Sequence, residues 1–269
     1  MPLAICATPI GNLDDITLRV LTELREADLV LCEDTRHTRV LLRRHGIEAR
    51  VLSYHRHNEA SRAEDVVARL ERGERVALVS DAGLPGVNDP GARLVAAAVA
   101  AALPVTVLPG PSAVETAVVA SGLVRGRFQF VGYLPRRARE LEALAEEIAR
   151  WPHGVVAFES PRRLPASLAT LARQMPARPA AVCRELTKRF EEVARGALRE
   201  LADRFTDPPK GEVTLVLGED ADSDVAEVPH RAVAAVAELV AAGVPRRHAV
   251  DLVVRLTGAP RNALYRSSL

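Results

Sequence analysis

The chain has 269 residues, of which 48% are hydrophobic and 26% charged, and its formal net charge is +1 at pH 7. This length and composition predict a globular protein of two domains with ample core. No apolar run approaches the roughly 18 uncharged residues of a membrane span, so no membrane segment is expected. The balanced charge neither favours nor excludes a nucleic-acid partner.

Strands and helices alternate in the first half of the chain, which predicts a mainly parallel sheet. The expected strands are Leu3–Ala7, Asp28–Cys32, Arg50–Ser53, Arg75–Val79 and Val105–Leu108, and the expected helices are Ile16–Glu26, Arg36–His45, Arg62–Arg72, Ala92–Ala102 and Ala113–Ser121. Asp14 or Asp15 is expected to cap the first helix, Ser61 with Glu64 to form a capping box, and Gly73 to end the third helix.

The pattern changes after about residue 122. Five further strands with only two substantial helices predict a second α/β domain with more antiparallel pairing. The strands are Phe128–Tyr133, Gly154–Phe158, Ala180–Leu186, Glu192–Ala197 and Glu212–Leu217, and the helices are Arg137–Arg150 and Arg162–Arg173. We therefore expect an α/β fold with a mainly parallel N-terminal domain over residues 1–121 and a mixed second domain over residues 122–219.

A helical tail is predicted over residues 225–269. The acidic stretch 218–227 is typical of a linker, and short helices are expected at His230–Ala242, Arg246–Thr257 and Arg261–Ser267. The tail carries six arginines against three acids. It is either a helix-turn-helix-like RNA contact or a helical cap.

The run Ser-Asp-Ala-Gly-Leu-Pro-Gly-Val-Asn-Asp-Pro-Gly at residues 80–91 carries the most functional information. It joins an apolar strand to a helix, where open α/β sheets bind ligands. Its glycines allow close backbone approach or positive φ, while Pro85 and Pro90 stiffen the loop. The sequence therefore predicts a ligand-holding loop. Neither G-x-G-x-x-G nor a Walker A sequence is present, so standard dinucleotide and P-loop sites are not expected.

Polar side chains also follow the second expected strand. Glu33 and Asp34 could accept hydrogen bonds from ligand hydroxyls, take part in proton transfer or cap the next helix. That helix carries a stripe of arginines along one face: Arg36, Arg39 and Arg43, with Arg44 beside them. The stripe suits either a solvated face or a phosphate backbone.

Lysine is rare in this chain. Only two of the 36 basic residues are lysines, Lys188 and Lys210. Arginine stays protonated, whereas lysine can lose its proton. A retained lysine therefore either marks proton chemistry or has survived by chance.

The three cysteines, Cys6, Cys32 and Cys183, lie in apolar runs without metal-ligand spacing. We expect reduced core thiols in a cytoplasmic protein and no metal site. The first strand begins without a basic region or cleavage signal before it, so no secretory segment is expected.

A family resemblance rests on segments spread along the chain. In order they are Thr8–Leu13, Glu33–Arg36, His55–Glu59, Ser80–Gly83, Asn88–Gly91, Pro109–Pro111, Phe158–Ser160 with Arg163, Arg184–Lys188 and Lys210–Glu212. Together they resemble the tetrapyrrole-methylase superfamily, and more closely its ribosomal RNA small subunit methyltransferase I family. Ser-Asp-Ala-Gly followed by Asn-Asp-Pro-Gly is specific to this RNA branch. The chain departs from the family pattern at Leu84, where a Thr or Ser is expected, and at Gly86, where a bulkier residue is expected.

The resemblance implies two α/β domains, a homodimer, and S-adenosyl-L-methionine held in the cleft between the domains. It also implies methylation of a ribose 2′-hydroxyl on a cytidine in the decoding region of small-subunit (16S) ribosomal RNA, in the assembled 30S subunit. By position, the cofactor would contact Pro9, Ile10, Gly11, Asp81, Ala82, Gly83, Leu84, Pro111, Ser112, Ala113, Phe158, Glu159, Leu186 and Thr214.

The acceptor hydroxyl of such a reaction is a poor nucleophile, so a group must remove or polarise its proton. The candidates are Lys188, Glu185, Asp34 and Glu33, with Lys188 first because arginine could not replace it as a base.

RNA contacts are assigned to arginines, because aromatic residues make up only 3% of the chain and stacking platforms of the single-strand-binding type are not expected. The arginines expected to contact RNA are Arg36, Arg39, Arg43, Arg44, Arg162 and Arg163. Two alternatives stay open: a methylase of the same fold acting on a tetrapyrrole or a protein, and a non-enzymatic RNA-binding factor.

Overall fold

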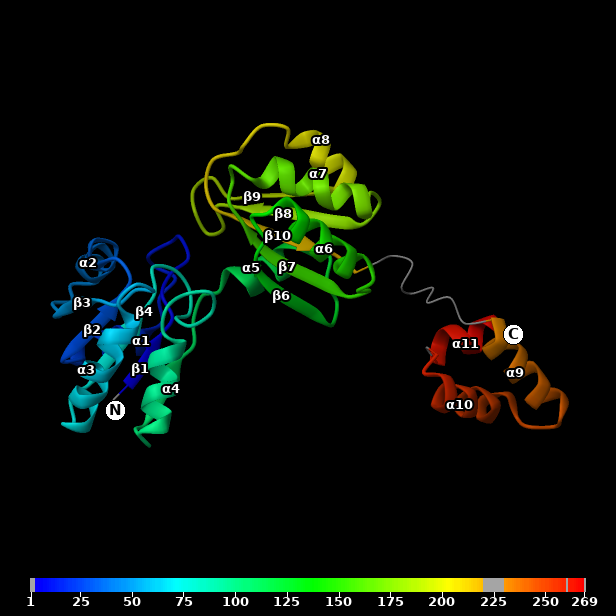
Figure 1. Cartoon of the computed structure of the whole chain (residues 1–269), viewed down its shortest axis with the longest axis horizontal. Helices are drawn as coiled ribbons and strands as arrows, with labels where there is room; N and C mark the ends of the chain where they lie inside the picture. The colour runs from blue at the N-terminus through cyan, green and yellow to red at the C-terminus, as the bar shows by residue number, and fades with distance from the viewer. Residues whose placement is uncertain (1–2, 220–229, 260, 269) are drawn as a thin grey trace.

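The computed structural model describes residues 3–219, 230–259 and 261–268. Figure 1 shows two sheet-containing units, one built from the N-terminal part of the chain and one from the middle, and a group of three helices at the C-terminal end. The predicted α/β class is confirmed by the two sheets.

The first unit is a sheet of five parallel strands in the order β3-β2-β4-β1-β5. Its strands are β1 (Leu3–Cys6), β2 (Leu29–Cys32), β3 (Val51–Ser53), β4 (Val76–Val79) and β5 (Val105–Leu108). Helices α1 (Leu18–Glu26) and α2 (Thr35–Arg44) cover one face, and α3 (Glu59–Glu71) and α4 (Ala92–Ala100) cover the other. The three inner strands β1, β2 and β4 are therefore buried at every residue, which explains their unbroken apolar runs.

Two predicted helix starts are wrong. Thr17, not Asp14 or Asp15, caps α1, because its side chain accepts a hydrogen bond from the Val20 backbone N–H at 3.2 Å. Helix α3 begins at Glu59, so Ser61 lies inside it, and its hydroxyl donates to the Asn58 carbonyl instead of capping the helix. The predicted end of α3 is confirmed: Gly73 follows the last turn with a φ of +86°.

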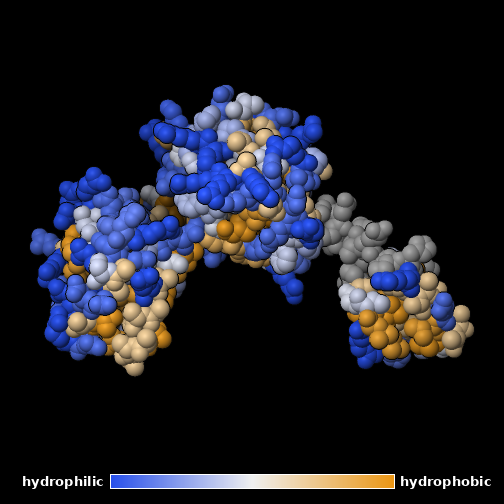
Figure 2. Space-filling view, in the orientation of Figure 1, coloured by the Kyte–Doolittle hydropathy of each residue, from blue (hydrophilic) through white to orange (hydrophobic). Residues whose placement is uncertain are grey.

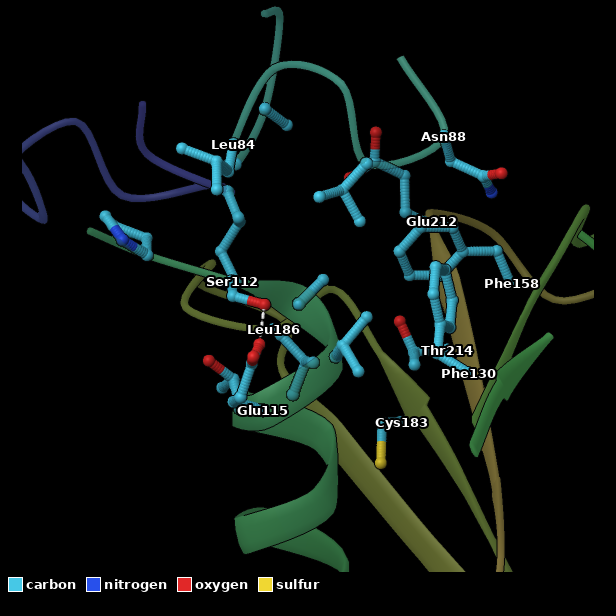
Figure 3. Close-up of a pocket in the computed structure, with 18 of the residues that line it drawn as sticks. Leu84, Asn88, Ser112, Glu115, Phe130, Phe158, Cys183, Leu186, Glu212 and Thr214 are labelled. Carbon is cyan, nitrogen blue, oxygen red and sulfur yellow. Dashed lines mark hydrogen bonds between the residues drawn. The ribbon is translucent and has the colours of Figure 1, made fainter. Parts of the chain in front are cut away.

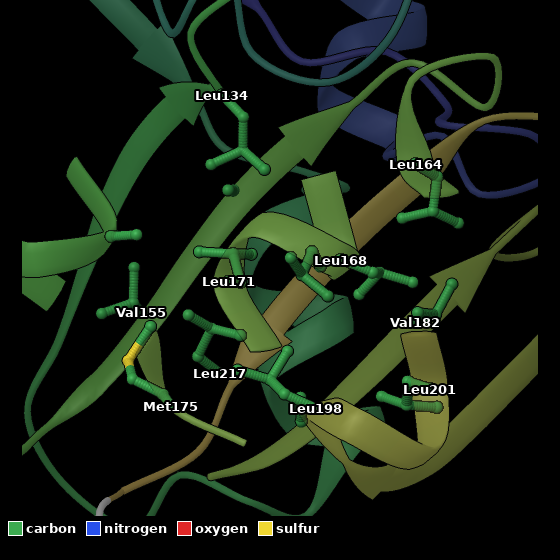
Figure 4. Packing of buried hydrophobic residues seen from close by; sticks show 14 of the residues in the cluster. Leu134, Val155, Leu164, Leu168, Leu171, Met175, Val182, Leu198, Leu201 and Leu217 are labelled. Carbon is green, nitrogen blue, oxygen red and sulfur yellow. The ribbon is translucent and has the colours of Figure 1, made fainter. Parts of the chain in front are cut away.

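The second unit is a mixed sheet in the order β6-β7-β10-β8-β9, in which only β6 and β7 pair in parallel. Its strands are β6 (Phe128–Tyr133), β7 (Gly154–Glu159), β8 (Pro179–Arg184), β9 (Glu192–Ala197) and β10 (Val213–Leu217). One face packs on α6 (Ala138–Ala149), α7 (Leu164–Gln174) and α8 (Leu198–Arg204), around leucines such as Leu168, Leu171 and Leu201 (Figure 4). The extra antiparallel pairing is confirmed. Helix α8 was not predicted, because its 7 residues are too few to show a helical period.

Helix α5 (Ala113–Ser121) packs against the second sheet, although it follows the last strand of the first. Val114 and Ala117 belong to one apolar cluster with Val156 and Val216 of the second sheet, and Ile10 from the loop after β1 joins them. The chain therefore crosses from one unit to the other between β5 and α5, and we group α5 with the second unit.

The predicted tail helices are present as α9 (His230–Ala241), α10 (Arg246–Thr257) and α11 (Arg261–Ser267). They pack around apolar residues that include Ala232, Val236, Val250 and Leu264. Figure 2 shows hydrophobic surface on the tail and a second apolar area under the middle unit, over α5 and β6. From residue 220 onward the expected linker lies outside the described residues. Among the described helices, none has the length and apolar character needed to cross a membrane.

The three cysteines are buried and unpaired. Burial raises the pKa of the Cys6 thiol to about 12 and that of Cys183 to about 11, so both stay protonated at neutral pH. Within the described residues, no group of three or more His, Cys, Asp or Glu side chains could hold a metal ion.

Candidate functional site

A cavity of about 1040 Å³ lies between the two units. The loops after β4 and β5 line it from the first unit, and the start of α5 and strands β6, β7, β8 and β10 line it from the second. Figure 3 shows Leu84 and Asn88 on one side, facing Phe130, Phe158 and Thr214 on the other. This size is typical of a small-molecule site.

The loop at residues 80–91 is fastened to the loop after β1. Thr8 and Gly83 exchange backbone hydrogen bonds, with N–O distances of 2.8 and 3.0 Å. The Thr8 hydroxyl donates to the Ser80 carbonyl, and the Ser80 hydroxyl donates to the Gly83 carbonyl. Gly83 has a φ of +77°, which a side chain would disfavour. The predicted ligand loop is therefore held rigidly at the cavity wall.

Three carboxylates gather where this loop meets the end of β2: Glu33, Asp81 and Asp89. Asp81 accepts a hydrogen bond from the Asp34 backbone N–H. Burial, together with the charges of Glu33 and Asp81, raises the pKa of Asp89 to about 6. Burial and the charge of Asp81 likewise raise the pKa of Glu33. Asp81 and Asp89 line the cavity, so this wall favours a positively charged ligand group.

Aromatic rings form the opposite wall. Phe158 at the end of β7 makes edge-to-face contacts with Phe130, at 4.9 Å between centroids, and with Tyr133, at 5.5 Å. Below them Glu159 is buried and accepts hydrogen bonds from the Ser160 N–H and the Ser167 hydroxyl. Arg163 forms an ion pair with Glu159 and also donates to the carbonyls of Leu134 and Pro135. The guanidinium of Arg163 thus links Glu159 at the end of β7 to the chain segment that follows β6.

The backbone N–H groups at the start of α5 lie beside the cavity. Ala113 and Val114 line it, and the Ser112 hydroxyl donates to the Glu115 carboxylate (dashed in Figure 3). The N-terminus of a helix of 9 residues attracts anionic groups through its unpaired N–H groups and its dipole.

Lys188 lies between two glutamates in the loop after β8. Its Nζ donates to Glu185 Oε1 at 2.9 Å and to Glu212 Oε2 at 2.8 Å, and the Glu212 N–H donates to Glu185 as well. Burial alone would lower the pKa of Lys188, but its hydrogen bonds to the two carboxylates outweigh that effect and raise it. The same bonds lower the pKa of Glu185. We call Lys188, Glu185 and Glu212 the lysine–glutamate unit.

Gly11, in the loop after β1 of the N-terminal sheet, packs directly against Lys188 of the lysine–glutamate unit. A Cβ on Gly11 would lie 2.5 Å from Lys188 Cγ and 2.8 Å from the Leu186 carbonyl. The neighbouring Asn12 N–H donates to the Thr187 hydroxyl at 3.0 Å. Only glycine at position 11 allows the two loops to approach this closely.

The arginine stripe on α2 is exposed, and two of its four arginines form ion pairs with carboxylates. Arg36 pairs with Asp34, which also caps α2, and this lowers the pKa of Asp34. Arg44 pairs with Asp14. Among the described residues, Arg39 and Arg43 form no ion pair, and Arg162 on the second unit is also exposed without one.

Most of the residues named from the sequence for the cofactor meet in the cavity. They are Ile10, Asp81, Ala82, Gly83, Leu84, Pro111, Ser112, Ala113, Phe158, Glu159, Leu186 and Thr214. Pro9 and Gly11 are not in its lining, nor are Glu33, Asp34, Glu185 and Lys188. Sequence reasoning missed Asn88, Asp89, Phe130, Tyr133 and Glu212, which do line it. Asn88, Asp89 and Glu212 lay inside segments that carry the resemblance but were not named as site residues, whereas Phe130 and Tyr133 had no sequence signal.

The family model for Tetrapyrrole (Corrin/Porphyrin) Methylases matches residues 2–202. Three similar proteins carry the name ribosomal RNA small subunit methyltransferase I. The protein of Mesorhizobium japonicum is 43% identical, over 99% of this chain and 91% of its own length. The protein of Escherichia coli O157:H7 is 39% identical, over 99% of this chain and 94% of its own length. The protein of Thermotoga maritima is 42% identical, over 80% of this chain and 97% of its own length.

Solved structures share the fold. The methyltransferase CobJ aligns with a TM-score of 0.63 at 21% identity, over 81% of this chain and 94% of its own. The cobalt precorrin-4 methyltransferase CbiF aligns with a TM-score of 0.60 at 20% identity, over 80% and 94%. With a family model that matches residues 2–202, which hold the first sheet and all of the second except β10, and relatives above 40% identity over nearly the full length of this chain, this chain belongs to the tetrapyrrole methylases and, among them, to the ribosomal RNA small subunit methyltransferase I family.

Proposed function

We propose that this chain methylates small-subunit ribosomal RNA at the ribose 2′-hydroxyl of a cytidine in the decoding region, using S-adenosyl-L-methionine. The observation that carries the proposal is the cavity between the units, which meets the lysine–glutamate unit at Glu212. Relatives named ribosomal RNA small subunit methyltransferase I align along nearly the whole chain, which supports RNA as the substrate.

The side chains and N–H groups around the cavity fit S-adenosylmethionine. Asp81, Asp89 and the faces of Phe158 and Tyr133 would favour a sulfonium cation. The N–H groups at the start of α5 would hold the carboxylate of S-adenosylmethionine. The apolar side chains that line the cavity would hold its adenine. When bound, S-adenosylmethionine supplies a methyl group on a sulfur that leaves as a neutral thioether. The two rigid walls supply the alignment that such a transfer needs.

The lysine–glutamate unit would receive the acceptor ribose. Sequence reasoning placed Lys188 first as the base, but a lysine with a raised pKa holds its proton at neutral pH. We therefore propose that the Lys188 ammonium orients the acceptor oxygen and that Glu212, which lines the cavity, takes the hydroxyl proton. Glu185 holds both partners in place. Glu33 and Asp34 do not line the cavity, but the Asp34 N–H donates to Asp81, so they would support the cofactor through that side chain.

The remaining expectations concern partners. We propose that Arg39, Arg43 and Arg162, exposed and without ion pairs in the described residues, contact RNA phosphates, together with the paired Arg36 and Arg44. Val119 on α5 and Phe128 on β6 are exposed, and Figure 2 shows an apolar area over these two elements, which supports a homodimer. The cytoplasm and the assembled 30S subunit are the proposed setting.

Tritium-labelled methyl transfer tests the function. Purified protein is incubated with labelled S-adenosylmethionine and either 30S subunits from a strain that lacks the gene, naked 16S RNA, or a porphyrinoid. Label on 30S subunits or RNA, mapped by mass spectrometry to one cytidine ribose, is expected. Label on the porphyrinoid alone would indicate the tetrapyrrole alternative, and failure to bind S-adenosylmethionine by calorimetry would indicate a non-enzymatic factor.

A further inference from the structure

Phe190, in the loop between β8 and β9, is the most exposed aromatic side chain among the described residues, at 67%. A single exposed apolar residue is ordinary on a protein surface. Phe190, however, lies two residues after Lys188, in a chain in which only 3% of residues are aromatic. Its position beside the lysine–glutamate unit is what requires an explanation.

The loop that carries Phe190 is rigid. Two consecutive turns shape it, since the Lys188 N–H donates to the Glu185 carbonyl and the Glu191 N–H donates to the Lys188 carbonyl. The Glu191 carboxylate accepts a hydrogen bond from the Thr187 N–H at 2.7 Å. Glu185 and Thr187 both have positive φ, at +52° and +65°, a conformation that non-glycine residues adopt only when surrounding contacts impose it. The loop therefore holds the ring in solvent.

An arginine accompanies the ring. The guanidinium carbon of Arg189 lies 5.5 Å from the centroid of the Phe190 ring, and Arg189 forms no ion pair within the part of the chain that the structure describes. An exposed ring with an adjacent arginine is the combination that proteins use to stack unpaired nucleobases.

The loop position of the ring fits a base next to the proposed acceptor ribose. In a nucleotide, the base is attached to the carbon next to the one that bears the 2′-hydroxyl. A ribose whose 2′-hydroxyl reaches Glu212 and Lys188 therefore leaves its own base, or the adjacent one, close to the 185–191 loop. Tyr133, 61% exposed, lines the same cavity as Glu212, so a second aromatic side chain lies on the cavity that the lysine–glutamate unit meets.

We propose that Phe190, with Arg189, is a stacking platform for an unpaired nucleobase next to the acceptor ribose. This rests on the proposed RNA methylation, and it makes Phe190 a positioning residue for the RNA. The target nucleotide then has to be drawn out of its base stack before methyl transfer.

Steady-state kinetics with RNA substrate test the platform. Phe190→Ala is expected to raise KM for the RNA about 5- to 140-fold, which is about 1–3 kcal/mol at 1.4 kcal/mol per tenfold. The affinity for S-adenosylmethionine and the thermal midpoint should stay unchanged, and Phe190→Trp should restore KM. Val99→Ala, which trims another exposed apolar side chain, on α4, is the matched control.

An unchanged KM in Phe190→Ala, while the wild-type protein methylates RNA, would overturn the platform alone. A wild-type protein that transfers no methyl to RNA would overturn both the platform and the proposed function. Photocrosslinking with p-benzoylphenylalanine in place of Phe190 identifies what the ring faces. Capture of RNA supports the proposal, and capture of a ribosomal protein instead contradicts it.

Discussion

Substituting Lys188 separates two roles that the same side chain could have. Lys188→Arg keeps a permanent positive charge between Glu185 and Glu212, whereas Lys188→Met removes it. If the ammonium orients the acceptor, the arginine variant should retain part of the activity and the methionine variant should lose it. If neutral lysine is the base, both variants should be inactive.

The magnitude favours the ammonium. With an ordinary pKa of about 10.4, about one lysine in a thousand is neutral at pH 7.5, which amounts to about 4 kcal/mol added to the barrier. The two carboxylates raise the pKa of Lys188 further, so the neutral fraction is smaller still. If neutral Lys188 were the base, the rate would increase about tenfold per pH unit up to the pKa of Lys188, because the neutral fraction increases by that factor.

The assay is the pH dependence of kcat for both variants and the wild-type protein, between pH 6 and pH 10, with label transfer to 30S subunits. We expect a wild-type rate that is nearly flat from pH 7 to pH 9, and Lys188→Arg within about a hundredfold of it. Calorimetric binding of S-adenosylmethionine should be the same in all three proteins. A wild-type rate that rises tenfold per pH unit, together with an inactive Lys188→Arg, would refute the ammonium role and restore Lys188 as the base.

Three further substitutions test the site and its support. Gly11→Ala should abolish methyl transfer, because the added Cβ meets Lys188 and Thr187 within 2.7 Å. Gly126→Ala should not, because its Cβ would lie 4.0 Å from the nearest atom, a Glu219 carboxylate oxygen, and label transfer measures both variants. The pKa of Asp89, raised to about 6, means that the folded state binds its proton more tightly than the unfolded state. The contribution of Asp89 to stability should therefore fall as pH rises from 4 to 6, by at most about 3 kcal/mol, and urea titrations should show that Asp89→Asn removes this pH-dependent contribution relative to the wild-type protein. Arg178→Ala leaves the carbonyls of Ile148, His153 and Gly218 without their donor, so it should lower the free energy of unfolding by about 3 kcal/mol, with cofactor binding intact at low temperature.

The alternation of apolar strands with helices was sufficient to predict the first sheet. Parallel strands covered on both faces have to be apolar throughout, and β1 and β4 are. The ligand loop at residues 80–91 was also predictable, since its glycines and prolines follow β4 at a sheet edge. The capping box predicted for Ser61 and Glu64 was wrong, because this pair caps a helix only at its start and α3 begins two residues earlier, at Glu59.

Contacts between the units were beyond the reach of local patterns. The sequence of α5 is apolar on much of its surface, and nothing in its period indicates that Val114 and Ala117 pack on the second sheet. Glu212 and Asp89 share no sequence motif, and only the docking of the two units makes both line one cavity. For the same reason the sequence pointed to Lys188, Glu185, Asp34 and Glu33 but not to Glu212, which accepts a hydrogen bond from the Lys188 ammonium.

The docking also explains why the lysine–glutamate unit requires both sheets. Its geometry depends on Glu185 and Thr187 staying at positive φ, which is unfavourable unless other contacts hold them. Some of those contacts come from the second sheet, where the Glu185 N–H donates to the Glu212 carbonyl. The others come from the first unit, where Asn12 donates to Thr187 and Gly11 leaves room for Lys188. A separation of the two units would remove the Asn12 contact and leave Thr187 held by Glu191 alone, so the acceptor site and the cofactor cavity form together.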